Sequence, residues 1–460
     1  MSLHPSNKRH KRKNPSKSEP HEAQDPDDCL GFMQWPCLSQ RHCNERVGGY
    51  KYKYETRAYE FARSPPHGRV QFLVCGIRSY SRRPCTMTKR WLMPQEFRLA
   101  DMSAPPAALG GDFIRRASSS RVEIWLWSLA ALVFLMVIAG GATRLTESGL
   151  SITEWQPLTG VVPPLNEVMW RAEFENYKKI PQYAELFPGM DLSGFKFIYF
   201  FEWGHRLLGR MTGLAMALPL VFFWIRRELP PRFKSKLLGI LALGGLQGAV
   251  GWWMVKSGLS DRVEVAQERL AIHLLLASLT FAALVWLASS LRPSREKLRE
   301  HVRKALRGFS AVILLLLFVQ IGLGALVAGL RAGRAFNTWP LIDGYFWPPF
   351  EKLTLLSPIW WNALDNLLLV QFQHRMLAYA LFALAIAQAL AALWYAPGSG
   401  AARRARLVAI LVTGQAAFGV IALIFIVPLW AGLLHQAFAM VVLAAAVIST
   451  QKLAKPAISA

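Results

Sequence analysis

Histidine is the residue type whose positions in this sequence point most directly to chemistry. Of the ten histidines, five lie within the first hundred residues and His301 lies in a basic stretch. The other four, His205, His273, His374 and His435, stand inside long apolar segments. An imidazole in a bilayer costs free energy unless it has a partner, so such positions are candidates for function. One such histidine is as easily a hydrogen-bonded core residue, but four together favour ligation of a metal.

The four histidines form two couples along the chain, His205 with His273 and His374 with His435. Two imidazoles from neighbouring helices can supply both axial ligands of a heme iron. Zinc is the weaker alternative, because tetrahedral zinc needs more ligands than each couple offers and all five cysteines lie within the first hundred residues. The pattern therefore predicts two heme sites with all four histidines as iron ligands.

One polar residue distinguishes the two couples. Glu202 stands three residues before His205, whereas Gln371 stands three residues before His374. Residues three apart share a helix face, so each of these side chains should lie beside its histidine. A carboxylate can take or give a proton, whereas an amide can only form hydrogen bonds. We therefore expect Glu202 to be catalytic in a first-half reaction site, and the second half to hold a cofactor; a carboxylate that favours a helix N-terminus is the alternative.

An arginine directly follows one histidine of each couple. Arg206 follows His205, and Arg375 follows His374. A guanidinium is a planar donor that matches carboxylates, so both arginines are candidates to bind the propionates of a heme. The alternative is an ordinary arginine that extends to the membrane interface.

The elements that carry these residues are long apolar segments. The chain has 460 residues, of which 53% are hydrophobic and 18% charged. A helix needs about 20 apolar residues to cross a bilayer. Eight segments meet this length, at about 122–143, 198–225, 237–255, 270–291, 309–330, 367–394, 407–427 and 431–451. The sequence thus predicts an all-α integral membrane protein with eight transmembrane helices.

Charge sets the expected orientation of these helices. The formal net charge is +24, but the basic residues gather in the N-terminal extension and in alternate connections, such as 226–236 and 292–307. That distribution follows membrane topology and argues against a nucleic-acid partner. Both termini should therefore face the cytoplasm, or the matrix of a mitochondrion.

The two halves of the apolar region resemble each other. The segment E202-W-G-H-R-L-L-G-R aligns with Q371-F-Q-H-R-M-L-A-Y, and I272-H-L in the first half corresponds to L434-H-Q in the second. Each half has an even number of helices, so duplication keeps their direction. We expect two parallel, pseudo-twofold four-helix repeats. All four histidines should lie in the first two turns of their helices, near the outer face.

Three regions follow from this division. Residues 1–120 are basic, polar and irregular, and we expect a largely disordered extension that is not part of the natural protein if Met102 or Met93 is its start. We expect residues 121–291 to form an N-terminal four-helix half with the reaction site. We expect residues 292–460 to form a C-terminal four-helix half with the cofactor site. Acidic residues in the extension make a poor transit peptide, which favours a bacterial inner membrane over a mitochondrial one.

Seven motifs together resemble the heme A synthase family, in its mitochondrial and proteobacterial branch, over nearly all of residues 120–452. They are G140-G-A-T-R-L-T-E-S-G-L-S, E154-W-Q-P-L-T-G-V-V-P-P, E202-W-G-H-R-L-L-G-R, I272-H-L-L-L-A-S, F336-N-T-W-P-L-I-D-G, Q373-H-R and L434-H-Q. The other branch has a cysteine pair in its first outer loop, and no cysteine lies between Thr143 and Phe197 in this chain.

The resemblance implies an oxidoreductase that acts on a CH group. It would oxidise a methyl group of heme O twice, and loss of water would leave the formyl group of heme A for cytochrome oxidase. By resemblance, heme b is a permanent cofactor on His374 and His435. The substrate heme would lie between His205 and His273, with Glu202 beside the reacting carbon.

Two other function classes share these residues. A diheme b-type electron carrier linked to quinol would use the same histidines, and only Glu202 against Gln371 speaks against it. A proton-relay transporter ranks lower, because its midplane site would need broken helices. The expected partners are heme O, membrane lipid, and proteins of heme O synthesis and cytochrome oxidase assembly. The sequence leaves a homo-oligomer open.

Overall fold

The computed structural model describes residues 106–156, 159–260, 262–292 and 296–454, with side chains from residue 120 onward, as well as 46–47 and 50–51. The chain divides into two compact units, Met1–Arg98 and Leu99–Ala460. In the first unit, strands β1 (Arg46–Val47) and β2 (Tyr50–Lys51) pair antiparallel. The N-terminal extension predicted from the sequence otherwise lies largely outside the described residues.

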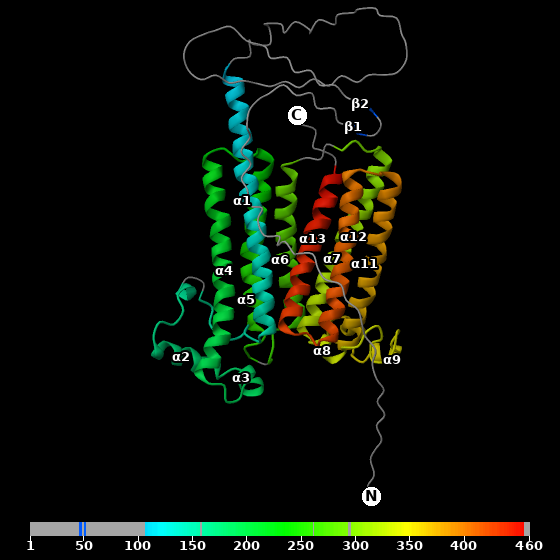
Figure 1. Cartoon of the computed structure of the whole chain (residues 1–460). Helices are drawn as coiled ribbons and strands as arrows, with labels where there is room; N and C mark the ends of the chain where they lie inside the picture. The colour runs from blue at the N-terminus through cyan, green and yellow to red at the C-terminus, as the bar shows by residue number, and fades with distance from the viewer. Residues whose placement is uncertain are drawn as a thin grey trace, which may run out of the picture. The chain divides into compact units, whose positions relative to one another are not determined.

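Within the described residues, eight helices are long and apolar enough to cross a membrane, with mean hydropathies from 1.5 to 2.7. They are α1 (Pro106–Leu145), α4 (Leu192–Ile225), α5 (Pro231–Lys256), α6 (Gln267–Ser290), α7 (Glu300–Gly329), α11 (Leu367–Tyr395), α12 (Gly400–Ile424) and α13 (Leu429–Leu453) (Figure 1). Each one contains most of a segment predicted from the sequence. The prediction of an all-α membrane protein with eight spans is confirmed.

Five helices, α1, α4, α5, α7 and α12, begin six or more residues earlier than the sequence analysis predicted, and two of these, α1 and α4, change what was expected of particular residues. α1 begins at Pro106, so residues 106–120 are helical, and the prediction of an irregular segment up to residue 120 was wrong at its end. α4 begins at Leu192, where the Asp191 side chain accepts a hydrogen bond from Gly194 N at 2.8 Å. His205 therefore lies in the fourth turn of α4, not in the first two. Both extensions lie outside the apolar run, where hydropathy alone gives no signal.

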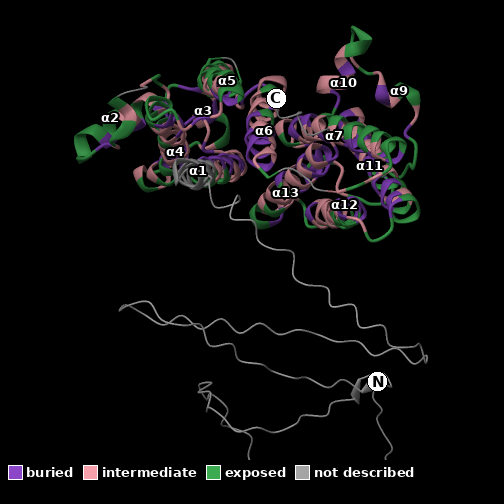
Figure 2. Cartoon of the chain, turned by 90° about the horizontal axis from the view of Figure 1, so that it is seen from above, coloured by how far each residue is buried: buried purple, intermediate pink, exposed green. Residues whose placement is uncertain are grey.

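Each half of the membrane unit is a ring of four helices. In the first half, α1 and α5 each pack against both α4 and α6; in the second half, α7 and α12 each pack against both α11 and α13. Viewed from above, the two rings lie next to each other (Figure 2). Within each ring, α4 stands diagonally across from α6, and α11 stands diagonally across from α13.

The two rings join through their inner helices. α6 packs against α7 and α13, and α13 also packs against α1. The buried side chains at this junction include Leu126, Phe281, Leu284 and Leu443. A polar contact crosses the junction too, since Gln436 Nε2 donates to the carbonyl of Val137 at 2.7 Å. Burial of apolar side chains and this hydrogen bond therefore hold the halves together.

Shorter helices occupy the long connections. The connection after α1 contains the 3-10 helix η2 (Thr159–Val161), α2 (Glu167–Tyr177) and α3 (Pro181–Leu186). The connection after α7 contains α8 (Ala332–Ala335), α9 (Phe350–Leu353), the 3-10 helix η3 (Ile359–Trp361) and α10 (Asn362–Asp365). Trp170, Phe174 and Tyr177 of α2 pack against Phe195 and Tyr199 of α4 in a buried aromatic cluster. This cluster encloses the first turns of α4, just before Glu202.

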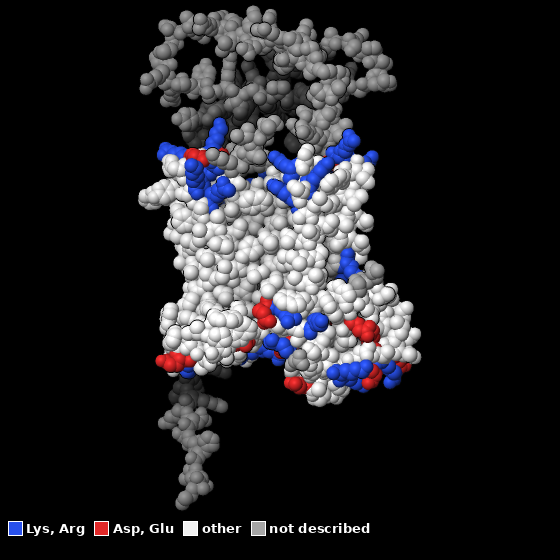
Figure 3. All heavy atoms as spheres, turned by 180° about the vertical axis from the view of Figure 1, so that it is seen from behind, with Lys and Arg blue, Asp and Glu red and all other residues white. Residues whose placement is uncertain are grey.

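The two ends of the membrane unit differ in the sign of the charged side chains that they expose. One face shows Lys and Arg gathered at one end, a broad band with few charges, and a mixture of acids and bases at the other end (Figure 3). The basic end includes Arg226 and Arg227 after α4 and Lys234 and Lys236 in α5. The mixed end includes Glu147 after α1. This asymmetry has the sense expected for a membrane protein whose basic end faces the cytoplasm.

Candidate functional site

The four helix-borne histidines fall into two couples, one inside each ring. His205 on α4 and His273 on α6 belong to the first ring; His374 on α11 and His435 on α13 belong to the second. Sequence reasoning expected neighbouring helices, but the helices of each couple are diagonal. A diagonal arrangement places the ligands on opposite sides of the interior of a bundle, which suits a group inserted between them.

Each imidazole packs against a glycine of an adjacent helix. A Cβ atom added to the glycine would lie about as close to the imidazole Cε1 in all four cases. The contacts are Gly140 with His205 at 3.0 Å, Gly251 with His273 at 3.0 Å, Gly324 with His374 at 3.1 Å and Gly419 with His435 at 2.8 Å. Any larger residue would push the ring away, so these four glycines set the position of the four imidazoles.

Three of the histidines also contact a glutamine one turn before that glycine. Gln247 lies against His273, Gln320 against His374 and Gln415 against His435. Each Gln Nε2 donates to the backbone carbonyl of its histidine, at 3.1, 3.0 and 3.0 Å respectively. Each also lies 3.1–3.4 Å from both ring nitrogens. Near-equal distances to both nitrogens place the amide over the ring face, since an in-plane hydrogen bond would favour one nitrogen.

Each of these three glutamines has an unsatisfied hydrogen-bond acceptor inside the protein. Oε1 of Gln247, Gln320 and Gln415 is buried and has no hydrogen-bond partner. Sequence reasoning missed these residues, although the signal was present: Gln-x-x-x-Gly occurs in three apolar segments, at Q247-G-A-V-G, Q320-I-G-L-G and Q415-A-A-F-G. A buried acceptor without a partner is unusual in a folded protein and points to a donor that completes the site.

His205 is the exception among the four. Met136 stands four residues before Gly140, where the other three helices have glutamine. The Nδ1 atom of His205 is buried without a hydrogen-bond partner. The Met136 methyl group lies 3.5 Å from a Cβ atom placed on Gly209, one turn after His205. Met136 therefore stands in place of the glutamine in the first ring, and the structure shows its methyl group against α4 one turn after His205.

Glu202 is the centre of a buried polar network. Its side chain is 3% exposed. Oε2 accepts hydrogen bonds from Ser151 Oγ at 2.8 Å and from Ile152 N at 2.9 Å. Oε1 accepts from Arg206 Nη2 at 2.6 Å and from Arg206 Nε at 3.1 Å. The carboxylate is thus held at both oxygens, by the outer connection on one side and by its own helix on the other.

At the corresponding position of the second ring, Gln371 acts as a hydrogen-bond donor, whereas Glu202 acts as an acceptor. Gln371 Nε2 donates to the carbonyl of Phe336 at 2.8 Å, and its Oε1 is buried without a partner. Arg375 donates to the carbonyls of Phe336 and Leu341 at 3.1 and 3.2 Å. Among the described residues, no carboxylate forms an ion pair with Arg375, and its Nε has no partner. The second ring therefore contains a buried cation without an anion.

Arg206 is more fully engaged than Arg375. Besides Glu202, it donates to the carbonyl of Glu154 from Nη1 at 3.1 Å and to the carbonyl of Ile152 from Nη2 at 2.9 Å. A heme propionate at Arg206 would have to share these donors. Over residues 120–454, outside the undescribed gaps, no three His, Cys, Asp or Glu side chains converge as a metal cluster. Two imidazoles suffice for a heme iron because the porphyrin supplies the other ligands.

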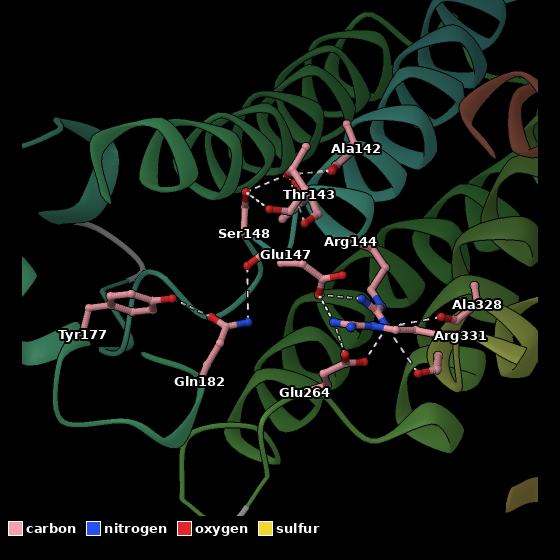
Figure 4. Close-up of polar contacts among 12 residues, drawn as sticks. Ala142, Thr143, Arg144, Glu147, Ser148, Tyr177, Gln182, Glu264, Ala328 and Arg331 are labelled. Atoms are coloured by element: carbon pink, nitrogen blue, oxygen red, sulfur yellow. Dashed lines mark hydrogen bonds and ion pairs between the residues drawn. The ribbon is translucent and has the colours of Figure 1, made fainter. Parts of the chain in front are cut away.

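A second polar network ties the outer connections of the two halves together (Figure 4). Arg144, at the end of α1, pairs with Glu147 at 2.9 Å and with Glu264 at 2.6 Å. Arg331, after α7, pairs with Glu147 at 2.9 Å and also with Glu264. Two cations and two anions thus alternate across the boundary between halves. Sequence reasoning did not single out these residues.

Comparison with known proteins gives a direct result. A family profile described as "Cytochrome oxidase assembly protein" matches residues 123–447, which include all eight spans in whole or in large part. A heme A synthase of Beijerinckia indica is 62% identical over 356 residues, which cover 77% of this chain and 98% of the relative. The chain belongs to the heme A synthase family. This confirms the resemblance inferred from the seven motifs.

Other relatives in the heme A synthase family match over a similar span. One from Rhodopseudomonas palustris strain BisA53 is 55% identical over 332 residues, 72% of this chain and 91% of the relative. One from Bradyrhizobium diazoefficiens is 54% identical over 333 residues, 72% of this chain and 91% of the relative. The histidine couples and Glu202 all lie inside the span matched by the family profile.

Proposed function

We propose that this protein is a heme A synthase, an enzyme that oxidises a methyl group of heme O to a formyl group and so supplies heme A to cytochrome oxidase. Relatives that are 54–62% identical and named heme A synthase support the activity. The structural observation that carries the proposal is the asymmetry between the rings. Each ring has a diagonal histidine couple, but only the first has a buried carboxylate, Glu202, one turn from a histidine.

The first ring is the proposed reaction site, with substrate heme O between His205 and His273. Glu202 is the group there that can accept a proton released as the methyl carbon is oxidised. Ser151 and Ile152 hold Oε2, while Arg206 holds Oε1. Four donors fix the orientation of the carboxylate. The residues of this network act as binding and orienting groups around one acid–base group.

The second ring is the proposed site of a permanent heme b, held by His374 and His435. The residues fit such a group: Gly324 and Gly419 form the cradles, and the buried Arg375 has no carboxylate partner in the part of the chain that the structure describes. A propionate would supply the missing anion, and Arg375 Nε is a free donor for it. When bound, a heme of this kind supplies one-electron transfer. Gln371 can form hydrogen bonds there but cannot act as a base, in keeping with a cofactor site.

The test of this proposal is the heme content and activity of the purified protein. Methyl-to-formyl oxidation adds one oxygen atom and removes four electrons, so the protein supplied with heme O and an electron acceptor should form heme A, which extraction and chromatography detect alongside heme B. A diheme electron carrier would contain heme B alone and leave heme O unchanged. A reduced-minus-oxidised spectrum should show two distinct hemes in the intact protein. Failure to form any heme A from bound heme O would overturn the synthase proposal.

We also propose a cellular location and partners for the enzyme. The protein is a multi-pass membrane protein, and its relatives listed above come from bacteria. We place it in a bacterial inner membrane, with both termini on the cytoplasmic side where the basic end lies. Its partners would be the protein that delivers heme O and those that insert heme A into cytochrome oxidase. Residues 121–291 and 292–460 would form the substrate and heme b halves, and removal of residues 1–101 should leave heme content unchanged.

A further inference from the structure

The structure departs from its internal repeat at the buried Glu202 and at the half-buried Met136, and both departures concern the surroundings of one histidine, His205. Packing order pairs α1 with α7, α4 with α11, α5 with α12 and α6 with α13. His273 and His435 have equivalent partners, Gln247 and Gln415. His374 is contacted by Gln320. His205 is the residue of the first ring that corresponds to His374. In its surroundings, Met136 stands where the second ring has Gln320, and Glu202 stands where the second ring has Gln371.

The glutamines hold their histidines in two ways. The hydrogen bond from Gln320 Nε2 to the carbonyl of His374 ties α7 to α11 at the level of the ligand. The same amide lies against the ring, so it limits rotation of the imidazole. An imidazole bound to iron through one nitrogen carries a proton on the other, and an acceptor for that proton fixes the ring and strengthens the ligand. The Gln320 amide lies over the ring face in this structure, so its buried Oε1, which has no hydrogen-bond partner, would accept that proton once the ring turns toward it on binding iron.

His205 has neither the glutamine hydrogen bond to its backbone carbonyl nor the glutamine amide against its ring. Gly140 still sets the position of its ring, but Met136 offers only a thioether, which is a weak acceptor, and it forms no hydrogen bond to the backbone of α4. The Nδ1 atom of His205 is buried without a partner. Loss of a partner of this kind lowers metal affinity by about 10-fold to 100-fold at other sites.

We propose that Met136 is a positioning residue that makes His205 the weaker, exchangeable ligand, so that heme leaves the first ring readily while the second ring retains it. This inference depends on the proposed function in one respect: a heme must bind at both histidine couples. A synthase must release its product, whereas a permanent cofactor must stay bound. The second ring has a glutamine at both of its ligands; the first ring has one at His273 alone.

The experiment measures heme release from the full-length protein in detergent. Excess apomyoglobin captures released heme, and the Soret absorbance gives the rate. Wild type should show a fast and a slow phase, and the fast phase should be absent from a His205→Ala variant. Met136→Gln should slow the fast phase about 10-fold and leave the slow phase unchanged. Met136→Leu, an apolar control of similar size, should behave as wild type.

The reverse exchange tests the same idea in the other ring. Gln320→Met should accelerate the slow phase about 10-fold and leave the fast phase unchanged. Unchanged release rates in a folded Met136→Gln variant, or in Gln320→Met, would overturn the role of the glutamine. Protein that releases heme as expected but forms no heme A would retain this inference and refute the synthase. Wild-type protein that binds no heme would refute both.

Discussion

Arg206 lies one helical turn after Glu202 on α4, and its guanidinium donates two hydrogen bonds to the same carboxylate oxygen, from Nη2 at 2.6 Å and from Nε at 3.1 Å. The other carboxylate oxygen faces the outer connection. The i,i+4 spacing allows this contact on any helix, but here both groups are largely shielded from water. The orientation of the Glu202 carboxyl group is consequently fixed by contacts on both oxygens.

Substitution Glu202→Gln should separate binding from oxidation. Glutamine has nearly the same shape and can still accept from Ser151 or Ile152, so the fold and the bound heme should be retained. It cannot accept a proton, and formation of heme A should fall about 100-fold or more. Heme extraction after incubation with heme O measures the loss. Gln371→Asn, in the second ring, is the matched control and should keep most activity; full heme A production by Glu202→Gln would remove Glu202 from the mechanism.

Substitution Arg206→Met should destabilise the protein because it leaves the Glu202 carboxylate buried without its cation. Breaking a buried ion pair in this way costs about 3 kcal/mol. The double variant with Glu202→Gln should recover much of that loss, since no unpaired charge remains. Thermal unfolding in detergent, followed by helical circular dichroism, gives the four free energies of the cycle. Additive effects would show that the pair is not coupled.

The division of labour between rings predicts different heme losses. His374→Ala and His435→Ala should deplete heme B, whereas His205→Ala and His273→Ala should deplete the substrate heme. Each substitution would remove one of the two imidazoles that would hold the heme of its ring, and would leave the other ring intact. Pyridine hemochrome spectra with chromatography of extracted hemes identify which heme is lost. Equal loss of both hemes from all four variants would contradict separate sites.

The outer ion-pair network should contribute to the stability of the pair of halves. Arg331→Gln removes a cation from Glu147 and Glu264, which are mostly shielded from solvent, and should lower the free energy of unfolding by about 1–3 kcal/mol. The control is Arg171→Gln, whose partner Glu167 and own side chain are 66% and 69% exposed. An exposed pair of that kind contributes about 0–1 kcal/mol. Equal effects of the two substitutions would show that the network adds no stability.

Some features of this protein are determined locally, and the sequence alone was enough to predict them. Eight apolar segments require eight spanning helices, because backbone polar groups in a bilayer must be satisfied within the helix. Four histidines stand in those segments, and Glu202 in the first repeat corresponds to Gln371 in the second. Both facts can be read from positions along the chain alone. The family resemblance also rests on contiguous motifs. Helix ends were less predictable, as at Pro106 and Leu192, because they extend beyond the apolar runs.

The remaining features were decided by tertiary packing. Sequence reasoning could not identify which helix faces which, because lipid-facing and interior surfaces of a membrane bundle are both apolar and periodicity does not distinguish them. Gln320 reaches His374 across 54 residues of chain, and Arg144 reaches Glu264 across 120. The register of packed helices sets such contacts. Residue type and position along the chain were thus enough to identify the four proposed iron ligands, whereas only the folded bundle showed that His273, His374 and His435 each have a glutamine amide beside them.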